Sequence, residues 1–219
     1  MWEMRNIEWH AVPQLLKGIG AAALDIANGH SRKDCWLASW IPLIRERANG
    51  VPVLELGCGQ GHDTLMMTSA GLKVIAIDSS SAMLERARCK APLARFYDRD
   101  LRCDFPVQRA GVVVASLSLH YFGWNETMEI VGRIKQVLVP GGVLLCRLNS
   151  TRDVNFGAKG HREIERNYYM VHGQTKRFFD QGDVQRLFSD WEPLSLVEKV
   201  THRFGMPKTA WEIAVGVNQ

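Results

Sequence analysis

Val51-Pro-Val-Leu-Glu-Leu-Gly-Cys-Gly-Gln-Gly61 is the stretch that decides the fold of this 219-residue chain. An apolar run followed by glycines at alternate positions predicts a buried strand that turns sharply into a helix. Glycines tolerate positive φ angles and carry no side chain that would block a ligand, and the first turn of a helix beginning near Asp63 has free N–H groups. We therefore expect a ligand to approach the backbone between Gly57 and Gly61.

The spacing of these glycines excludes two common phosphate-binding turns. A phosphate-binding loop needs a lysine directly after its last glycine, whereas Gly61 is followed by His62. The dinucleotide fingerprint Gly-x-Gly-x-x-Gly fits Gly57 and Gly59 but would need its third glycine at the position of His62. The observed pattern is Gly-x-Gly-x-Gly, and an ordinary tight turn remains the alternative to a ligand site.

A second strand, predicted over 73–78, ends in the carboxylate of Asp78 about 20 residues after the glycines. A carboxylate at this strand end can accept hydrogen bonds from both hydroxyls of a ribose. The alternative is that Asp78 caps the helix predicted over 82–90. The order strand, glycine loop, helix, strand and acid is that of a βαβ nucleoside site, which favours ribose binding.

Composition indicates one globular domain. Hydrophobic residues make up 46% and charged residues 23%, as in soluble proteins, and no apolar run approaches the roughly 18 residues of a membrane span. The formal charge of +4 comes without a lysine- or arginine-rich run, so a nucleic-acid partner is not indicated. The five cysteines form no Cys-x-x-Cys pair, which predicts reduced thiols in a cytoplasmic protein. The histidines show no metal-ligand spacing, so we expect no metal site.

From residue 51 onward, predicted strands and helices alternate, which indicates an α/β, doubly wound domain over 51–219. The last two strands are joined by a short segment containing Gly and Pro, which predicts a hairpin at one edge. Residues 150–180 are polar and long for a connection, which favours a lid, a substrate loop or disorder. The predicted strands cover 51–56, 73–78, 94–97, 111–117, 143–149, 194–200 and 210–217, and the predicted helices cover 63–70, 82–90, 125–138 and 181–188.

Residues 1–50 are predicted to form a helical extension, whose second helix covers 34–48. Trp36 and Trp40 lie four residues apart and would share one face of that helix. They either pack against the domain core or line a lid over cofactor and substrate, where aromatic faces suit a cation or a planar acceptor.

The segment after the fourth predicted strand carries His120 and Tyr121. In open α/β sheets, ligands bind outside the carboxyl ends of the strands, so these two side chains are expected at the cleft. A purely structural role for His120 is the alternative, and the sequence leaves the two interpretations open.

Five motifs follow one another in the order and spacing of class I S-adenosylmethionine (SAM)-dependent methyltransferases: Glu55-x-Gly57-x-Gly59-x-Gly61, Asp78, Asp100-Leu101, the segment 116–122, and Pro140-Gly141-Gly142. Over 51–149 the chain resembles that superfamily. The segments 118–122, 176–179 and 208–212 are similar to a bacterial small-molecule branch near the tellurite-resistance and thiopurine-type methyltransferases. The chain departs from the pattern at Arg109-Ala110-Gly111, where the family usually has an aromatic residue followed by aspartate.

The resemblance implies a seven-stranded, mostly parallel, Rossmann-like sheet with an antiparallel C-terminal hairpin and an N-terminal helical lid. It implies SAM as the cofactor and S-adenosylhomocysteine as the product. The glycines would approach methionine and ribose, Asp78 would hold the ribose hydroxyls, and Asp100 and Leu101 would bind adenine. The cofactor-binding residues expected on this basis are Glu55, Gly57, Cys58, Gly59, Gly61, Asp78, Ser79, Met83, Asp100, Leu101 and Ser116.

The implied reaction is an in-line displacement that moves a methyl group to a small-molecule acceptor. Nucleic-acid amino-methylating enzymes of this fold carry an Asp/Asn-Pro-Pro-Tyr/Phe motif after the fourth strand, and this chain does not. A poorly acidic acceptor hydroxyl would need a general base, for which His120 and then Tyr121 are the candidates. Candidate substrate-binding residues are Trp36, Trp40, Asn149, Tyr168 and Arg203.

Basic residues between 150 and 180 either meet an anionic acceptor or belong to a solvated loop. Two other functions stay open: a non-catalytic SAM-binding regulator and, less favoured, an NAD(P)-dependent oxidoreductase.

Overall fold

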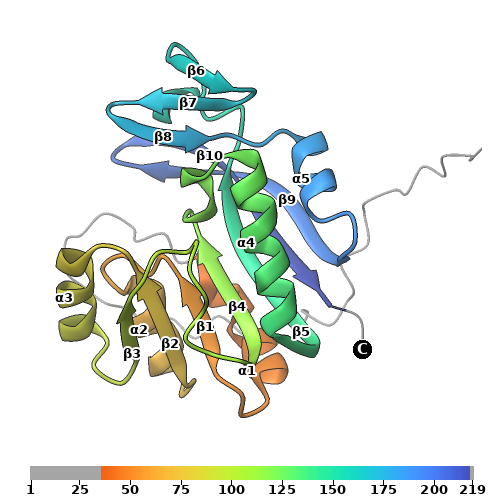
Figure 1. Cartoon of the computed structure of the whole chain (residues 1–219). Helices are drawn as coiled ribbons and strands as arrows, with labels where there is room; N and C mark the ends of the chain where they lie inside the picture. Colours follow the sequence, from red (N-terminus) through yellow and green to blue (C-terminus); the bar gives the residue numbers. More distant parts are fainter. Residues whose placement is uncertain (1–35, 218–219) are drawn as a thin grey trace, which may run out of the picture. The chain divides into compact units, whose positions relative to one another are not determined.

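A seven-stranded sheet is the centre of the computed structural model, which describes residues 36–217. The strand order is β3-β2-β1-β4-β5-β10-β9 (Figure 1). The first five strands of that order run parallel, whereas β10 pairs antiparallel with both β5 and β9. The strands are β1 (Val53–Leu56), β2 (Val74–Asp78), β3 (Arg95–Asp98), β4 (Ala110–Ser116), β5 (Leu138–Asn149), β9 (Glu192–Arg203) and β10 (Met206–Gly216). The predicted mostly parallel sheet with an antiparallel C-terminal hairpin is therefore confirmed.

Helices cover both faces of this sheet (Figure 1). Ile44 of α1 and Met67 of α2 belong to one buried apolar cluster, and Ile130 of α4 belongs to another. Neighbouring residues of β1 alternate between them, because Val53 joins the first cluster and Leu54 the second. The helices are α1 (Ile41–Ala48), α2 (His62–Ser69), α3 (Ser81–Lys90), α4 (Trp124–Val137) and α5 (Gln181–Leu187), with short 3₁₀ turns η2 (Trp36–Trp40), η3 (Leu119–Tyr121) and η4 (Val154–Phe156). Within 36–217, none of the helices is long and apolar enough to cross a membrane.

The helix predicted over 34–48 is divided in two. The chain forms the 3₁₀ turn η2 and then α1, which has Pro42 in its first turn. Proline lacks an N–H donor and fits this position, because the first helical N–H groups have no intrahelical partner. The part of the predicted lid that precedes residue 36 lies outside the described residues.

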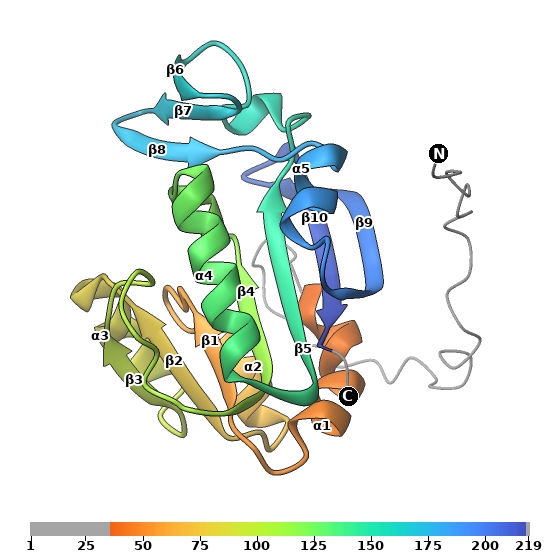
Figure 2. The same cartoon turned by 45° about the vertical axis from the view of Figure 1, so that its right-hand side comes forward.

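Residues 150–180 contain a second, small sheet where the sequence predicted a lid, loop or disorder. Its strands β6 (Arg162–Glu165), β7 (Tyr168–Val171) and β8 (Gln174–Arg177) are antiparallel and lie beyond the carboxyl ends of β4 and β5 (Figure 2). The second hairpin turns at His172 and Gly173, which both have positive φ angles (48° and 80°) and suit a two-residue turn. The insert also begins and ends side by side, since Ser150 forms an isolated parallel bridge with Phe179.

Gly111 of β4 lies directly against the end of α1. A Cβ atom at this position would lie 2.5 Å from the carbonyl oxygen of Arg47 and 2.7 Å from Cα of Ala48. The end of α1 thus passes so close to β4 that a side chain at position 111 would clash with its backbone.

Glu55 places a carboxyl group inside the core of the main sheet. It is 3% exposed, and the hydroxyl of Thr64 in α2 donates a 2.5 Å hydrogen bond to it. Burial raises the pKa of Glu55 to about 8, so the group is mostly protonated at neutral pH.

We expect Gly111→Ala to lower the free energy of unfolding by about 1–3 kcal/mol, because the added methyl group must push α1 away from β4. Gly132 in α4 is a matched control, since a Cβ atom there would meet nothing within 4 Å. Gly132→Ala should raise stability by up to about 1 kcal/mol through helix propensity. Denaturant unfolding measures both, and a Gly111→Ala protein as stable as the wild type would contradict the close approach.

Glu55→Gln should change how stability depends on pH. The raised pKa means that the folded protein keeps a proton which the unfolded chain releases above pH 4.5, so this stabilising contribution is complete below pH 4.5 and is lost as the pH rises toward 8. Across that window, wild-type stability should fall relative to Glu55→Gln by up to about 1.4 kcal/mol per pH unit. Urea unfolding of both proteins at pH 6, 7 and 8 measures the difference, and a constant difference would refute a protonated Glu55.

Candidate functional site

The glycine loop connects β1 to α2 and bends through three positive φ angles, 71° at Gly57, 53° at Gly59 and 75° at Gly61. Two of these glycines are needed for protein packing. A Cβ atom at Gly57 would lie 2.5 Å from Cβ of Ser118, and one at Gly61 would lie 3.0 Å from Ala87. At Gly59 a Cβ atom would meet no atom within 4 Å. Gly59 is therefore the glycine of the loop that faces open space.

Asp78 ends β2 beside this loop. One of its carboxylate oxygens accepts a hydrogen bond from the N–H of Gly59 at 2.8 Å, and the other accepts from the N–H of Ser80 at 2.9 Å. The cap of α3 is Ser80, whose hydroxyl accepts from the N–H of Met83. Capping is thus done by another residue, and each oxygen of Asp78 keeps capacity for a further hydrogen bond. Ser79 beside it is exposed and Met83 is half-buried.

Asp100 and Leu101, predicted to hold adenine, have other contacts within the protein. The carboxylate of Asp100 accepts two hydrogen bonds from the guanidinium of Arg102, at 2.7 and 3.0 Å, and these bonds lower the pKa of Asp100. Leu101 is 6% exposed and belongs to the apolar cluster under α4. An adenine contact of Asp100 would therefore have to share the carboxylate with Arg102, and one at Leu101 would use its backbone rather than its buried side chain.

Cys58, in the glycine loop, is a buried thiol. Burial raises its pKa, and the nearby carboxyl groups of Glu55 and Asp78 raise it further. The thiol therefore stays protonated and packs as a small apolar side chain.

The end of β4 is linked to η2, which carries Trp36 and Trp40, through the side chain of Arg147. Arg147 of β5 donates to the hydroxyl of Ser116 at 3.0 Å, and its guanidinium lies 4.8 Å from the ring centre of Trp36. Trp36 in turn donates through its indole nitrogen to Asp63 at 2.8 Å and is 6% exposed. Trp36 thus packs against the core at the carboxyl edge of the sheet. Trp40 is half-buried against the same apolar cluster.

His120 lies in η3 and is 5% exposed. Its Nδ1 atom and the hydroxyl of Ser118 are buried and have no hydrogen-bond partner among the described residues. Burial lowers the pKa of His120 to about 3, and the positive charges of Lys208, Lys176 and Arg203 add to this effect. The imidazole is therefore neutral near pH 7 and a weak base in this structure.

The next residue, Tyr121, is 44% exposed, and its ring centre lies 4.1 Å from that of His120. Its carbonyl oxygen accepts hydrogen bonds from the hydroxyls of Tyr168 at 2.9 Å and Thr175 at 3.1 Å. Tyr168, predicted to bind substrate, is therefore a support for the η3 segment.

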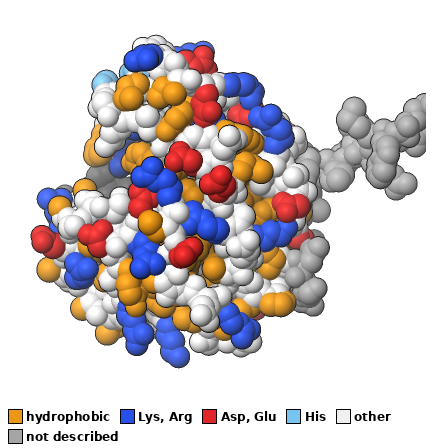
Figure 3. All heavy atoms as spheres, in the orientation of Figure 1, with side chains coloured by type: hydrophobic (Ala, Val, Ile, Leu, Met, Phe, Trp, Pro, Cys, Tyr) orange, Lys and Arg blue, Asp and Glu red, His pale blue; other side chains and the backbone are white. Residues whose placement is uncertain are grey.

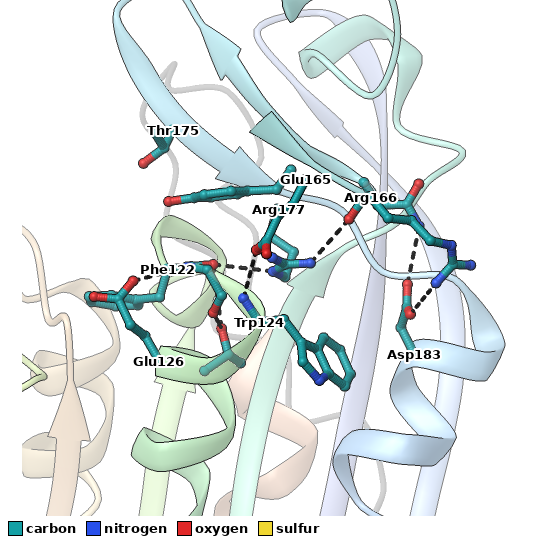
Figure 4. Close-up of polar contacts among 12 residues, drawn as sticks. Phe122, Trp124, Glu126, Glu165, Arg166, Thr175, Arg177 and Asp183 are labelled. Atoms are coloured by element: carbon teal, nitrogen blue, oxygen red, sulfur yellow. Dashed lines mark hydrogen bonds and ion pairs between the residues drawn. The ribbon is translucent and has the colours of Figure 1, made fainter. Parts of the chain in front are cut away.

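Arg177 of β8 holds the small sheet to the same segment (Figure 4). Its guanidinium is 3% exposed, donates to the carbonyl oxygen of Phe122 at 3.2 Å and forms an ion pair with Glu165. Glu165 also accepts from the N–H of Trp124 at 2.7 Å, at the first turn of α4. The small sheet thus holds the chain from Tyr121 to Trp124.

Lys208 of β10 is a buried cation that the sequence analysis missed. Its ammonium, 6% exposed as a residue, donates to the amide oxygen of Asn149 at 2.9 Å and to Asp153 at 2.7 Å. Asn149, predicted to bind substrate, therefore holds this lysine. Arg203 is exposed at the end of β9. A lysine in a strand that is otherwise largely buried was the signal available in the sequence, whereas its partners come from distant segments.

Comparisons with known proteins agree with this architecture. A family model described as a methyltransferase domain matches residues 53–142. Trans-aconitate 2-methyltransferase of Delftia acidovorans is 34% identical over 137 residues, which are 60% of this chain and 49% of that protein, so the chain spans about half of that relative. Carboxy-S-adenosyl-L-methionine synthase of Shigella boydii is 34% identical over 192 residues, which are 80% of this chain and 74% of that protein.

Solved structures share the fold. A SAM-dependent methyltransferase from Methanosarcina mazei has a TM-score of 0.65 at 18% identity and covers 76% of this chain and 92% of its own. TehB from Haemophilus influenzae has a TM-score of 0.59 at 16% identity and covers 80% of this chain and 61% of its own. Together with the identity to the Shigella protein over most of both lengths, these matches show that the chain belongs to the class I SAM-dependent methyltransferase superfamily.

Proposed function

We propose that this protein transfers a methyl group from SAM to a small-molecule acceptor. The observation that carries the proposal is the hydrogen bond between Asp78 and Gly59, because it sets a carboxylate beside the one glycine of the loop that faces open space. These residues fit a nucleoside. The open side of Gly59 admits it without a side-chain clash, and Asp78 has acceptor capacity left for ribose hydroxyls.

Bound SAM would supply a methyl group already activated by a sulfonium. The task of the chain is then to align the acceptor and exclude water. The segment 116–122 lies at the carboxyl end of β4 and touches the glycine loop through Ser118. We assign acceptor positioning to this segment, and the small sheet that holds it excludes water from one side.

A small molecule is the acceptor in this proposal. The relative from Delftia acidovorans is named for trans-aconitate, which makes this acid the first acceptor to test. On the face seen in Figure 3, Lys and Arg side chains are interspersed with Asp and Glu, and no broad basic surface suited to nucleic acid is visible there. The four described cysteines are unpaired thiols, in keeping with a reducing cytoplasm, where we place the reaction.

We further propose that His120 acts as a neutral hydrogen-bonding group rather than as a general base. Its pKa of about 3 leaves little driving force for taking a proton near pH 7. Acceptors that ionise by themselves, such as carboxylic acids, need only alignment.

Asp78→Asn should weaken S-adenosylhomocysteine binding by roughly 10- to 100-fold, because the charge-assisted hydrogen bonds to ribose are lost. Calorimetric titration of the full chain measures this. Asp190→Asn is the control, since Asp190 pairs with Lys135 away from the loop and its change should leave the affinity as it is. Wild-type protein that binds NADH but not S-adenosylhomocysteine would overturn the proposal.

His120→Gln should retain kcat within about tenfold, and wild-type kcat should show no step near pH 6.5, because the imidazole does not titrate there. The measurement is a pH profile of methyl transfer from labelled SAM, between pH 6 and 9, with whichever acceptor is turned over in a screen of acids that begins with trans-aconitate. A loss of roughly 100-fold or more, together with a wild-type rate that rises through pH 6.5, would instead establish His120 as the base.

A further inference from the structure

A cavity of about 330 Å³ lies at the edge of the main sheet opposite the glycine loop. The glycine loop follows the carboxyl end of β1, whereas this cavity is lined by Gly141 and Val143 near the start of β5. Figure 2 shows the place, where α1 lies beside the start of β5. A molecule in this cavity would therefore not touch the residues expected to bind the cofactor.

A glycine within a strand forms the floor of the cavity. Gly216 of β10 is paired with Val143 of β5 on one side and with Glu192 of β9 on the other. Paired residues of neighbouring strands point to the same face, so this row has a side chain at each end and none in the middle. Val143 belongs to the same apolar cluster as Ala48 of α1, which places the notch on the α1 face of the sheet.

The carboxylate of Glu192 lies at the side of this notch. Its Oε2 atom would be 3.8 Å from a Cβ atom at Gly216. Within residues 36–217, no lysine or arginine is at ion-pair distance from Glu192, and its side chain accepts no hydrogen bond. Leu194 lines the cavity next to it, at a β-bulge where it has no cross-strand partner.

Arg47, in the last turn of α1, supplies a positive charge to the same cavity. Its Nη1 atom donates to the carbonyl oxygen of Gly141 at 3.1 Å, which fixes the guanidinium. Its Nε atom is buried and has no hydrogen-bond partner among the described residues. The carboxylate of Glu46 is 3.3 Å from Nε, but that side chain is 67% exposed, and such a pair contributes at most about 1 kcal/mol. The edge formed by Nε and Nη2 thus keeps two parallel donors for a ligand carboxylate.

The two opposite charges line one cavity without pairing with each other. The space between them suits a molecule that carries a carboxylate and an ammonium group. Leu194 and Val217 add apolar walls. A volume of 330 Å³ equals that of roughly ten water molecules and is at the lower end of ligand pockets, which fits a ligand the size of an amino acid.

We propose that this cavity binds a small zwitterion, an α-amino acid with an apolar side chain. Arg47 holds the carboxylate of the ligand, Glu192 holds its ammonium group, and Leu194 contacts its side chain. The site goes beyond the proposed function, because none of its residues belongs to the glycine loop or to the segment 116–122.

The test uses the full chain and L-leucine, with L-valine and L-methionine as alternative side chains. Two analogues of leucine each lack one charge: leucinamide has no carboxylate, and 4-methylpentanoate has no ammonium group. Binding is followed by NMR on protein with ¹⁵N-labelled glycine, because Gly141 and Gly216 report on the cavity while Gly57, Gly59 and Gly61 report on the cofactor loop.

We expect at least one of the amino acids to shift the signals of Gly141 and Gly216 and to leave those of the glycine loop in place. Leucine should bind at least about tenfold more tightly than either analogue, since each analogue leaves one charge of the cavity unpaired. SAM itself carries an amino-acid group, so the titration is repeated with saturating S-adenosylhomocysteine. The leucine affinity should then stay within about twofold.

Three variants test the walls and the floor. Arg47→Gln and Glu192→Gln should each weaken amino-acid binding by about tenfold or more. Gly216→Val should abolish it by filling the notch, and the protein should remain folded, because a Cβ atom there would meet nothing closer than 3.7 Å. Thermal unfolding checks the fold of each variant. The matched controls are Arg45→Gln, whose arginine bonds to Ala70 instead, and Glu46→Gln, and both should bind as the wild type.

Absence of binding by all three amino acids at millimolar concentration would overturn the site. Unchanged affinity in folded Gly216→Val, equal binding of leucine and both analogues, or displacement of leucine by S-adenosylhomocysteine would do the same, the last by placing leucine in the cofactor site. These results leave the proposed function standing, which fails only if the wild-type protein does not bind S-adenosylhomocysteine in calorimetry.

Discussion

The hydrogen bond from the Gly59 N–H to Asp78 is the interaction on which the rest of the site depends. It joins the loop after β1 to the end of β2, two strands already held in parallel register from Val53 and Val74 onward. A hydrogen bond to a charged group contributes about 1.5–3 kcal/mol, enough to hold the otherwise freely rotating backbone of Gly59 in one conformation. The open side of the loop and the carboxylate that would meet ribose are therefore positioned together before any ligand arrives.

The central strands of the main sheet, such as β1 and β4, could be predicted because they are buried on both faces. A strand such as β4 is then a continuous apolar run, and each carboxyl-end residue falls at the same edge, which is how Asp78 and His120 were found. The small sheet gave no such signal. β6 has the sequence Arg-Glu-Ile-Glu and is exposed throughout, so its pairing with β7 follows from the hairpin rather than from burial.

Side-chain partners were the part of the site that sequence could not supply. Lys208 and Asp153 are 55 residues apart in the sequence, and Trp36 and Asp63 are 27 apart. Local sequence spacing therefore predicts neither hydrogen bond. Asp100 shows the reverse difficulty. Its type and position suggested adenine, but they did not indicate that the guanidinium of Arg102, two residues away, donates to the same carboxylate.

The two ends of the insert that carries the small sheet lie side by side in the main domain. Ser150 forms a β-bridge with Phe179, and the N–H of Phe179 donates to the carbonyl oxygen of Asn149 at 2.8 Å. The ends of the insert are pinned together by the domain itself, and lengthening a closed loop adds little entropic cost. The residues between these ends contribute no strand to the main sheet. Substitutions in the insert can thus change the surroundings of η3 while the glycine loop and Asp78, which lie on other strands, keep their positions.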